Sequence, residues 1–361
     1  MNRKTSLIFL VFLGLWAIGS ILPAFRSRGI SPILDNSLHA QSTPFYEGKT
    51  VRIILGAGGG YDFWARLLAR HMPKYIPGNP NFVVQNMFGA GSVIASNYVY
   101  NIAKPDGLTV GMPNQALYMG EFVGNKEAKF QMRKFLWIGS PDRNPSILYI
   151  RADTPFRSVE DVRKAQIPPK CGATGWDTSS IIPASEETLG AKFDLVVGYQ
   201  EANQVDLAVE RGEVVCRMLG LTAHFSREPF LTWHTKGFDR HLLQTGRKRD
   251  GRAADIPTVY ELMNQYKTAE INRRAVDVLT AGEDFGHPMM APPGTPSELV
   301  KILRDAYAKA LRDPELLAQA KKGQWVVEHV PGEELQALAE RIMNQPPEVV
   351  QRIKKLTRMN Q

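Results

Sequence analysis

The feature of this sequence that most constrains its fold is a repeated order of β-rich run, glycine-containing loop and amphipathic segment. Residues 50–55 form a β-rich run bounded by glycines, and residues 63–75 carry apolar side chains at helical spacing. Residues 81–85 and 108–112 predict two more strands, with a helix predicted at 92–103 between them. Strands and helices that alternate in this way are typical of an α/β fold with doubly wound, mostly parallel sheets.

The same pattern starts again near Ile147, which indicates a second α/β unit. A chain of 361 residues with 43% hydrophobic content is long enough for two packed domains. We therefore expect a two-lobed clamshell, with one lobe formed by residues 42–146 plus 285–361 and the other by residues 147–284. Folds of this kind bind ligands between the lobes, at the carboxyl ends of the strands.

The N-terminus has the order of a secretory signal. Arg3 and Lys4 precede an apolar run at 7–22, and Ala40 ends a segment of small and polar residues. We predict a signal peptide at residues 1–40 and hence an exported, periplasmic protein. A retained N-terminal membrane anchor remains the alternative, because the stretch between the apolar run and Ala40 is long for a cleavage region.

The charge balance favours small anions slightly. The chain has a formal net charge of +8. The predicted signal contributes +3, so the chain from Gln41 carries +5. Long-range attraction of anions and a simply solvated basic surface are both compatible with this excess. Basic and aromatic residues do not interleave as they do in nucleic-acid-binding proteins, so we expect no nucleic acid partner.

Three strand-to-helix loops, at residues 58–62, 89–92 and 174–179, are candidate ligand loops. Glycines let the backbone approach a ligand, and the N–H groups and dipole of a following helix suit an anion. A tight turn or a helix cap is the structural alternative at each loop, and we interpret Asp62 as a brace of the first. The candidate ligand-binding residues in and beside these loops are Gly59, Gly60, Tyr61, Asp62, Ala90, Gly91, Ser92, Asn114, Thr174, Gly175, Thr178 and Ser179.

Catalytic and cofactor motifs are not evident. A dinucleotide fingerprint on the first loop would need a glycine where Tyr61 stands. The sequence holds neither a phosphate-binding loop nor a nucleophile elbow. His224 and His234 are conceivable metal ligands, but the histidines lack helical or strand spacing. We therefore expect no catalytic residues, no cofactor and no metal.

The two cysteines, Cys171 and Cys216, lie in predicted strands of the second unit. Export would place them in an oxidising compartment, where a disulfide is possible. Two buried free thiols are equally compatible with the sequence.

Several short motifs, in order along the chain, resemble the periplasmic receptors of tripartite tricarboxylate transporters, the Bug solute-binding proteins. They are Tyr46-x-x-Lys49-x-Val51-Arg52, Gly58-Gly59-Gly60-x-Asp62-x-x-Ala65-Arg66, Asn86-x-x-Gly89-Ala90-Gly91, Pro105-Asp106-Gly107-x-Thr109, Thr174-Gly175-x-x-Thr178, Tyr199, Ile256-Pro257-Thr258 and Ala291-Pro292-x-Gly294-Thr295-Pro296. Each motif is weak alone, but their order and number make the set specific.

The resemblance implies a periplasmic-binding-protein-like clamshell of type II character. It implies that the first two loops hold a ligand carboxylate, that loops of the second lobe close over the rest, and that the ligand passes to a membrane permease without catalysis. Ligands of such receptors are mostly small organic acids. We expect the receptor to be monomeric.

The sequence departs from the family pattern in the second lobe. Val215 replaces a usual aspartate, and Arg217 beside it is a candidate partner for a second ligand carboxylate. Tyr61, Trp176 and Tyr199 are candidate cleft residues, with core packing as the alternative. Two other functions remain open: a receptor that feeds a sensor, and an exported enzyme acting on a small carboxylic acid.

Overall fold

The first sheet is built from both ends of the chain. The computed structural model describes residues 43–174, 181–199 and 202–357. Within these residues the sheet has six strands in the order β11-β4-β10-β3-β1-β2. The strands are β1 (Thr50–Leu55), β2 (Asn81–Asn86), β3 (Thr109–Met112), β4 (Leu136–Ser140), β10 (Met289–Ala291) and β11 (Val330–Pro331).

The second sheet lies in the middle of the sequence. Over the described residues it has five strands in the order β7-β6-β8-β5-β9. They are β5 (Ser146–Arg151), β6 (Lys170–Ala173), β7 (Asp194–Val197), β8 (Cys216–Gly220) and β9 (Asp239–Gln244).

Both sheets are mixed, but most strands of each sheet run in the same direction, as the sequence predicted. β1 pairs in parallel with β2 and β3, and β6 pairs in parallel with β7 and β8. In each sheet, the strand that follows the other sheet along the chain is antiparallel to both of its neighbours. β10 comes after β9 and lies between β3 and β4, and β5 comes after β4 and lies between β8 and β9. The predicted α/β class and two-sheet architecture are confirmed. The sequence did not predict which strand is inserted in the opposite direction, because the apolar pattern of a short strand does not encode its direction.

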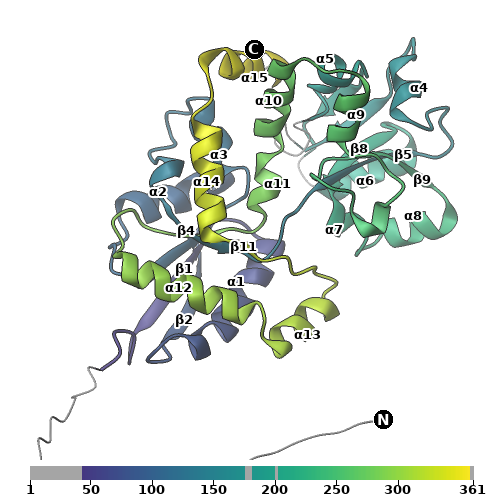
Figure 1. Cartoon of the computed structure of the whole chain (residues 1–361). Helices are drawn as coiled ribbons and strands as arrows, with labels where there is room; N and C mark the ends of the chain where they lie inside the picture. The colour runs from purple at the N-terminus through teal and green to yellow at the C-terminus, as the bar shows by residue number, and fades with distance from the viewer. Residues whose placement is uncertain (1–42, 175–180, 200–201, 358–361) are drawn as a thin grey trace, which may run out of the picture. The chain divides into compact units, whose positions relative to one another are not determined.

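The helices cover the sheets as layers (Figure 1). They are α1 (Gly60–His71), α2 (Val93–Asn101), α3 (Leu117–Phe122), α4 (Val159–Arg163), α5 (Ser185–Leu189), α6 (Ala202–Arg211), α7 (Leu221–His224), α8 (Phe230–Lys236), α9 (Val259–Gln265), α10 (Glu270–Leu279), α11 (Ala281–Phe285), α12 (Ser297–Ala310), α13 (Pro314–Lys322), α14 (Gly332–Met343) and α15 (Pro347–Thr357). Within the described ranges, no helix combines the length and apolar character needed to cross a membrane.

Strand β1 shows why its run of apolar residues is nearly continuous. Ile53 and Leu55 pack into one hydrophobic cluster with α1 and α12, whereas Ile54 packs into another with α2 and α14. A strand covered by helices on both faces needs apolar side chains on both. This packing places the carboxyl end of β1 between those of β2 and β3, so the three loops that follow these strands lie side by side.

A disulfide joins Cys171 of β6 to Cys216 of β8. The two residues are direct partners in the parallel ladder, and their Cα atoms are 4.4 Å apart. Of the two alternatives left by the sequence, the structure therefore has the disulfide.

Candidate functional site

The first glycine loop faces open space where α1 begins. A Cβ atom added at Gly58 or Gly59 would meet nothing within 4 Å, and Gly59 has φ of +64°. Helix α1 starts at Gly60, so the N–H groups of its first turn have no acceptor within the helix. The loop therefore presents backbone donors and the positive end of a helix dipole to an accessible volume, as an anion site requires.

Tyr61 ties this loop to two other segments. Its hydroxyl oxygen accepts from the backbone N–H of Gln115 at 2.8 Å, and its O–H lies 3.5 Å from the carbonyl oxygen of Gly286. Burial raises the pKa of Tyr61 far above its ordinary value, so the hydroxyl stays neutral. Tyr61 is thus a structural part of the loop, whereas the sequence left lining and core packing open.

His287 and Asp142 stand directly behind the loop, and the sequence analysis missed them. Both are buried, and His287 Nδ1 lies 2.8 Å from Asp142 Oδ1. The imidazole packs on the ring of Tyr61 with the centroids 4.5 Å apart. A Cβ added at Gly60 would lie 2.5 Å from His287 Nε2 and 2.7 Å from the Trp325 ring, so only glycine fits there. No sequence signal links His287 to Asp142, because 145 residues separate them.

The second loop has an unusual backbone. Gly89, Ala90, Gly91 and Ser92 all have positive φ, including +46° at Ala90 and +77° at Ser92. Such a conformation is costly for residues with a Cβ and is concentrated at functional sites. The run supports the interpretation of 89–92 as a ligand loop.

Ser92 does not cap the following helix, which was the structural alternative at this loop. Its hydroxyl oxygen accepts from the backbone N–H of Asn114 at 2.9 Å, and no side-chain cap bond forms. The Asn114 side chain in turn accepts from the N–H of Ala116 at 2.8 Å. A Cβ at Gly56 would lie 2.7 Å from Ser92 Oγ, which explains the glycine before the first loop. The loops after β1, β2 and β3 are therefore bound to one another.

Asp62 is paired with Arg66. The guanidinium binds both carboxylate oxygens, with Nε at 3.0 and 2.9 Å, one helical turn away on the exposed face of α1. Its negative charge is compensated locally, which agrees with the interpretation of Asp62 as a brace.

The second sheet contributes three described candidates. Thr174 follows β6, and Tyr199 follows β7 and packs against the cluster around Tyr149 and Trp233. Arg217 of β8 is buried and pairs with the buried carboxylate of Asp206 in α6. Gly175, Thr178 and Ser179, together with Trp176 and the predicted signal peptide at 1–40, lie outside the described residues.

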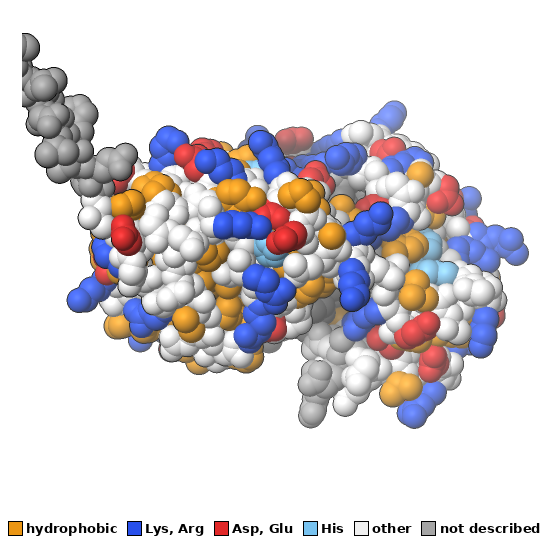
Figure 2. Space-filling model, turned by 90° about the horizontal axis from the view of Figure 1, so that it is seen from below, with side chains coloured by type: hydrophobic (Ala, Val, Ile, Leu, Met, Phe, Trp, Pro, Cys, Tyr) orange, Lys and Arg blue, Asp and Glu red, His pale blue; other side chains and the backbone are white. Residues whose placement is uncertain are grey.

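A cavity of about 670 Å³ lies elsewhere, at the segments that connect the two sheets. None of the predicted ligand residues that the structure describes lines it. Its charges are largely compensated in pairs: Arg143 contacts Asp284 and Glu334, and Arg247 contacts Asp277. Basic and acidic side chains are likewise interspersed on the face shown in Figure 2. The loops after β1, β2 and β3 remain the better candidate for an anion, because their donors are backbone N–H groups and the nearby Asp62 carboxylate is paired with Arg66.

Comparison with known proteins connects these loops to one family. The profile of the tripartite tricarboxylate transporter family receptor matches residues 65–355. A relative described as a UPF0065 protein in the tcbD-tcbE intergenic region of Pseudomonas sp. (strain P51) is 25% identical over 270 residues, which cover 73% of this chain and 74% of that protein.

Solved structures share the fold. A TctC solute-binding protein from Polaromonas has 22% identity and a TM-score of 0.66, with coverage of 87% of this chain and 99% of that one. An R. palustris protein solved with adipate has 17% identity, a TM-score of 0.59 and coverage of 86% and 97%. MatC from Rhodopseudomonas palustris, with bound malate, has 17% identity, a TM-score of 0.55 and coverage of 86% and 99%.

The family profile spans most of the chain, and the structural likeness extends over both sheets. The predicted family and the predicted clamshell of a periplasmic binding protein are both confirmed. The chain belongs to the receptors of the tripartite tricarboxylate transporter family, which are periplasmic solute-binding proteins.

Proposed function

We propose that this receptor captures a small organic acid in the periplasm, with one carboxylate at the loops that follow β1, β2 and β3, and delivers it unchanged to the permease of a tripartite transporter. The family supports the transport role, and two structural neighbours were solved with the dicarboxylates adipate and malate. The proposal extends to this chain what is known of those relatives.

The main support for a carboxylate site here is the open space next to Gly58 and Gly59. Around it, Gly60, Tyr61, Ala90, Gly91, Ser92 and Asn114 belong to loops fastened together by the Tyr61–Gln115 and Ser92–Asn114 hydrogen bonds. A site fixed in this way loses little entropy when the ligand binds. Asp62 then acts by positioning Arg66 and the first turn of α1.

The second sheet would hold the remainder of the ligand. We infer roles there for Thr174, Gly175, Thr178, Ser179 and Tyr199. Arg217 would act through its ion pair with Asp206, which fixes β8 to α6.

The lobe boundaries are also part of this proposal. All strands of the first sheet fall within 42–146 plus 285–361, and those of the second within 147–284 except that β5 begins at Ser146. Helix α15 lies in the first set by sequence, yet its Arg352 Nε contacts Asn272 of α10 at 2.7 Å. The C-terminal helix therefore links the two groups of residues.

A substitution in the glycine loop tests the site. Gly58→Ala adds one methyl group to the proposed carboxylate position without a clash with other protein atoms. Gly251→Ala is the matched control, since a Cβ there also meets nothing within 4 Å and lies outside the proposed site. Binding of adipate and malate would be measured by calorimetry, and thermal stabilisation by a broader carboxylate panel.

We expect wild type and Gly251→Ala to bind at least one acid equally, and Gly58→Ala to bind it at least tenfold more weakly at unchanged stability. Ligand at one hundred times Kd should raise the unfolding free energy by about 2.7 kcal/mol. If no carboxylate stabilises the wild-type protein, the proposal fails; equal binding by Gly58→Ala would move the site elsewhere.

Transport and catalysis are separated by two further measurements. Mass spectrometry of the ligand after incubation should recover it unchanged, whereas turnover would indicate an exported enzyme. Deletion of the receptor gene should abolish uptake of the acid through the permease; loss of a transcriptional response with normal uptake would indicate a sensor.

A further inference from the structure

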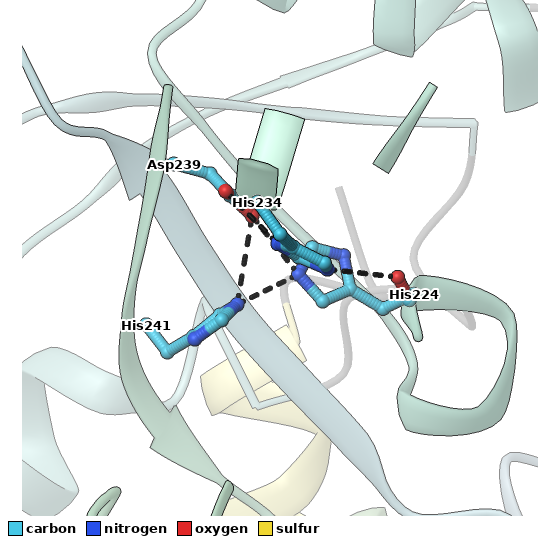
Figure 3. Close-up of side chains that lie close together, drawn as sticks. All are labelled: His224, His234, Asp239 and His241. Carbon is cyan, nitrogen blue, oxygen red and sulfur yellow. Dashed lines mark hydrogen bonds and ion pairs between the residues drawn. The ribbon is translucent and has the colours of Figure 1, made fainter. Parts of the chain in front are cut away.

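Four side chains from two helices and one strand converge beside the second sheet (Figure 3). His224 ends α7, His234 lies in α8, and Asp239 and His241 project from β9. One potential ligand atom from each lies within 4.8 Å of those from the other three. Asp239 and His241 share a face because they are two residues apart on a strand. Sequence spacing alone suggested scattered histidines and no metal.

Three of the ligand atoms form a compact triangle. His224 Nε2 lies 2.8 Å from His241 Nε2 and 3.1 Å from Asp239 Oδ2, and His241 Nε2 lies 3.5 Å from the same oxygen. Ligands bound tetrahedrally at Zn²⁺ distances of ~2.0–2.1 Å are about 3.3 Å apart. The observed separations need only shifts of a few tenths of an ångström to accept an ion at the centre.

Hydrogen bonds among these three atoms cannot satisfy all of them. A neutral imidazole carries one N–H, so the two facing Nε2 atoms share a single proton if that proton lies between them. Asp239 Oδ2 is buried, and with the proton in that position it receives no hydrogen bond from either of these two rings. A buried carboxylate oxygen without a donor is costly, and a cation between the three atoms would remove that cost.

His234 positions the carboxylate. Its Nδ1 lies 3.0 Å from Asp239 Oδ1 and its Nε2 lies 3.1 Å from the backbone oxygen of His224. Contacts of this kind orient ligands in metal sites. The ring of His224 is held by packing, since it stacks on Tyr149 with centroids 5.0 Å apart at 19° and its Nδ1 is buried without a partner in the described chain.

The cluster has both a buried floor and an access route. The side chains of His224 and Asp239 are 0% and 1% exposed, whereas those of His234 and His241 are 22% and 18% exposed. An ion would reach the triangle past these two partly exposed rings, and water would take the fourth position on that side.

The charge of the cluster is not already compensated. In the part of the chain that the structure describes, Asp239 forms its ion pairs with histidines only. The other His-carboxylate group, His71, Asp313 and Glu315, differs because Lys74 pairs with Asp313 and lies 3.6 Å from Glu315. There the Lys74 ammonium compensates the carboxylates, whereas no lysine or arginine of the described ranges pairs with Asp239.

We propose that His224, Asp239 and His241, positioned by His234, bind one divalent transition-metal ion of the Zn²⁺ class. Two imidazoles and a carboxylate suit Zn²⁺, whereas Mg²⁺ and Ca²⁺ prefer oxygen ligands. The ion would fasten α7 to β9, and the contacts of His234 would hold α8 against both. The proposal does not depend on the carboxylate site, which uses other residues.

Calorimetry with ZnCl₂ tests the proposal on the tag-free, chelator-treated full chain. We expect one Zn²⁺ per chain, no competition from a large excess of Mg²⁺, and a rise in Tm on binding. His241→Ala and Asp239→Asn should each weaken Zn²⁺ binding at least tenfold. Glu315→Gln, in the second His-carboxylate group, should bind like wild type and is the control.

Absorption of the Co²⁺-loaded wild type gives a test that needs no variant. Tetrahedral coordination by imidazole nitrogen should produce an intense visible band that Zn²⁺ removes at one equivalent. The proposal is overturned if wild type binds no stoichiometric Zn²⁺ and Co²⁺ gives no such band, or if His241→Ala and Asp239→Asn, folded by circular dichroism, bind as tightly as wild type.

Discussion

The hydroxyl oxygen of Ser92 accepts a hydrogen bond from the backbone N–H of Asn114 at 2.9 Å, and so joins the loop after β2 to the loop after β3. Ser92 is 1% exposed. The bond is therefore shielded from water, and its donor has no ready replacement partner if the hydroxyl is removed.

Ser92→Ala should lower the free energy of unfolding by about 1–2 kcal/mol, because a shielded N–H group loses its acceptor. Ligand affinity should fall as well, since two loops of the proposed site are no longer joined. Urea unfolding and calorimetry would measure both effects. Ser297→Ala is the control, because Ser297 is exposed and makes no cap bond. Equal stability of the two variants would contradict the role given to Ser92.

The ion pair of Arg217 and Asp206 should behave as a buried pair. Arg217→Met leaves the Asp206 carboxylate buried without this partner, so a loss of about 3–5 kcal/mol is expected. Arg66→Met breaks the exposed pair with Asp62 and should cost less than about 1 kcal/mol. Chemical denaturation of both variants makes the comparison. Similar losses would show that Arg217 is not held by Asp206, and would favour a direct role at the ligand.

Glu283 should make stability depend on pH. Burial is the main cause that raises its pKa to about 8 from 4.5, so it is protonated in the folded protein at neutral pH. The folded state then binds more protons than the unfolded state between these values. The contribution of Glu283 to the free energy of unfolding is therefore greatest below pH 4.5, and it is lost as the pH rises through 8.

Glu283→Gln should remove this dependence, because glutamine is neutral at every pH. Between pH 5 and 8 the wild type should lose stability relative to the variant by roughly 1.4 kcal/mol per pH unit. Urea unfolding at several pH values would measure the difference. The exposed substitution Glu127→Gln should leave the wild-type slope unchanged. Parallel stability profiles for wild type and Glu283→Gln would refute the assignment.

The Cys171–Cys216 disulfide should stabilise the protein through the loop that it closes. The two cysteines are 45 residues apart in sequence. Chain entropy then predicts a loss of about 2–4 kcal/mol when both are replaced by alanine. Thermal and urea unfolding of the double variant, with and without reductant, would measure the loss. Reductant should lower the stability of the wild type and leave that of the double variant unchanged.

The sequence determined which segments become strands and helices, and which loop exposes backbone N–H groups. The apolar run at 50–55 and the helical spacing after it predicted β1 and α1, because local periodicity reports which faces are buried. The glycines at 58–60 predicted a close-approach loop, and the ordered motifs predicted the family that the profile at 65–355 confirms.

Tertiary structure decided what depends on partners distant in sequence. The antiparallel insertion of β5 and β10, the bond from Asn114 to Ser92, and the packing of His287 against Tyr61 all join segments whose spacing carries no signal. His224, His234 and His241 looked scattered for the same reason, because a helix end, a helix and a strand meet only when the sheet is folded. The local sequence pattern determines which side chains are buried and which backbone conformation they adopt. Which distant residue a side chain contacts depends on how the chain crosses between the sheets.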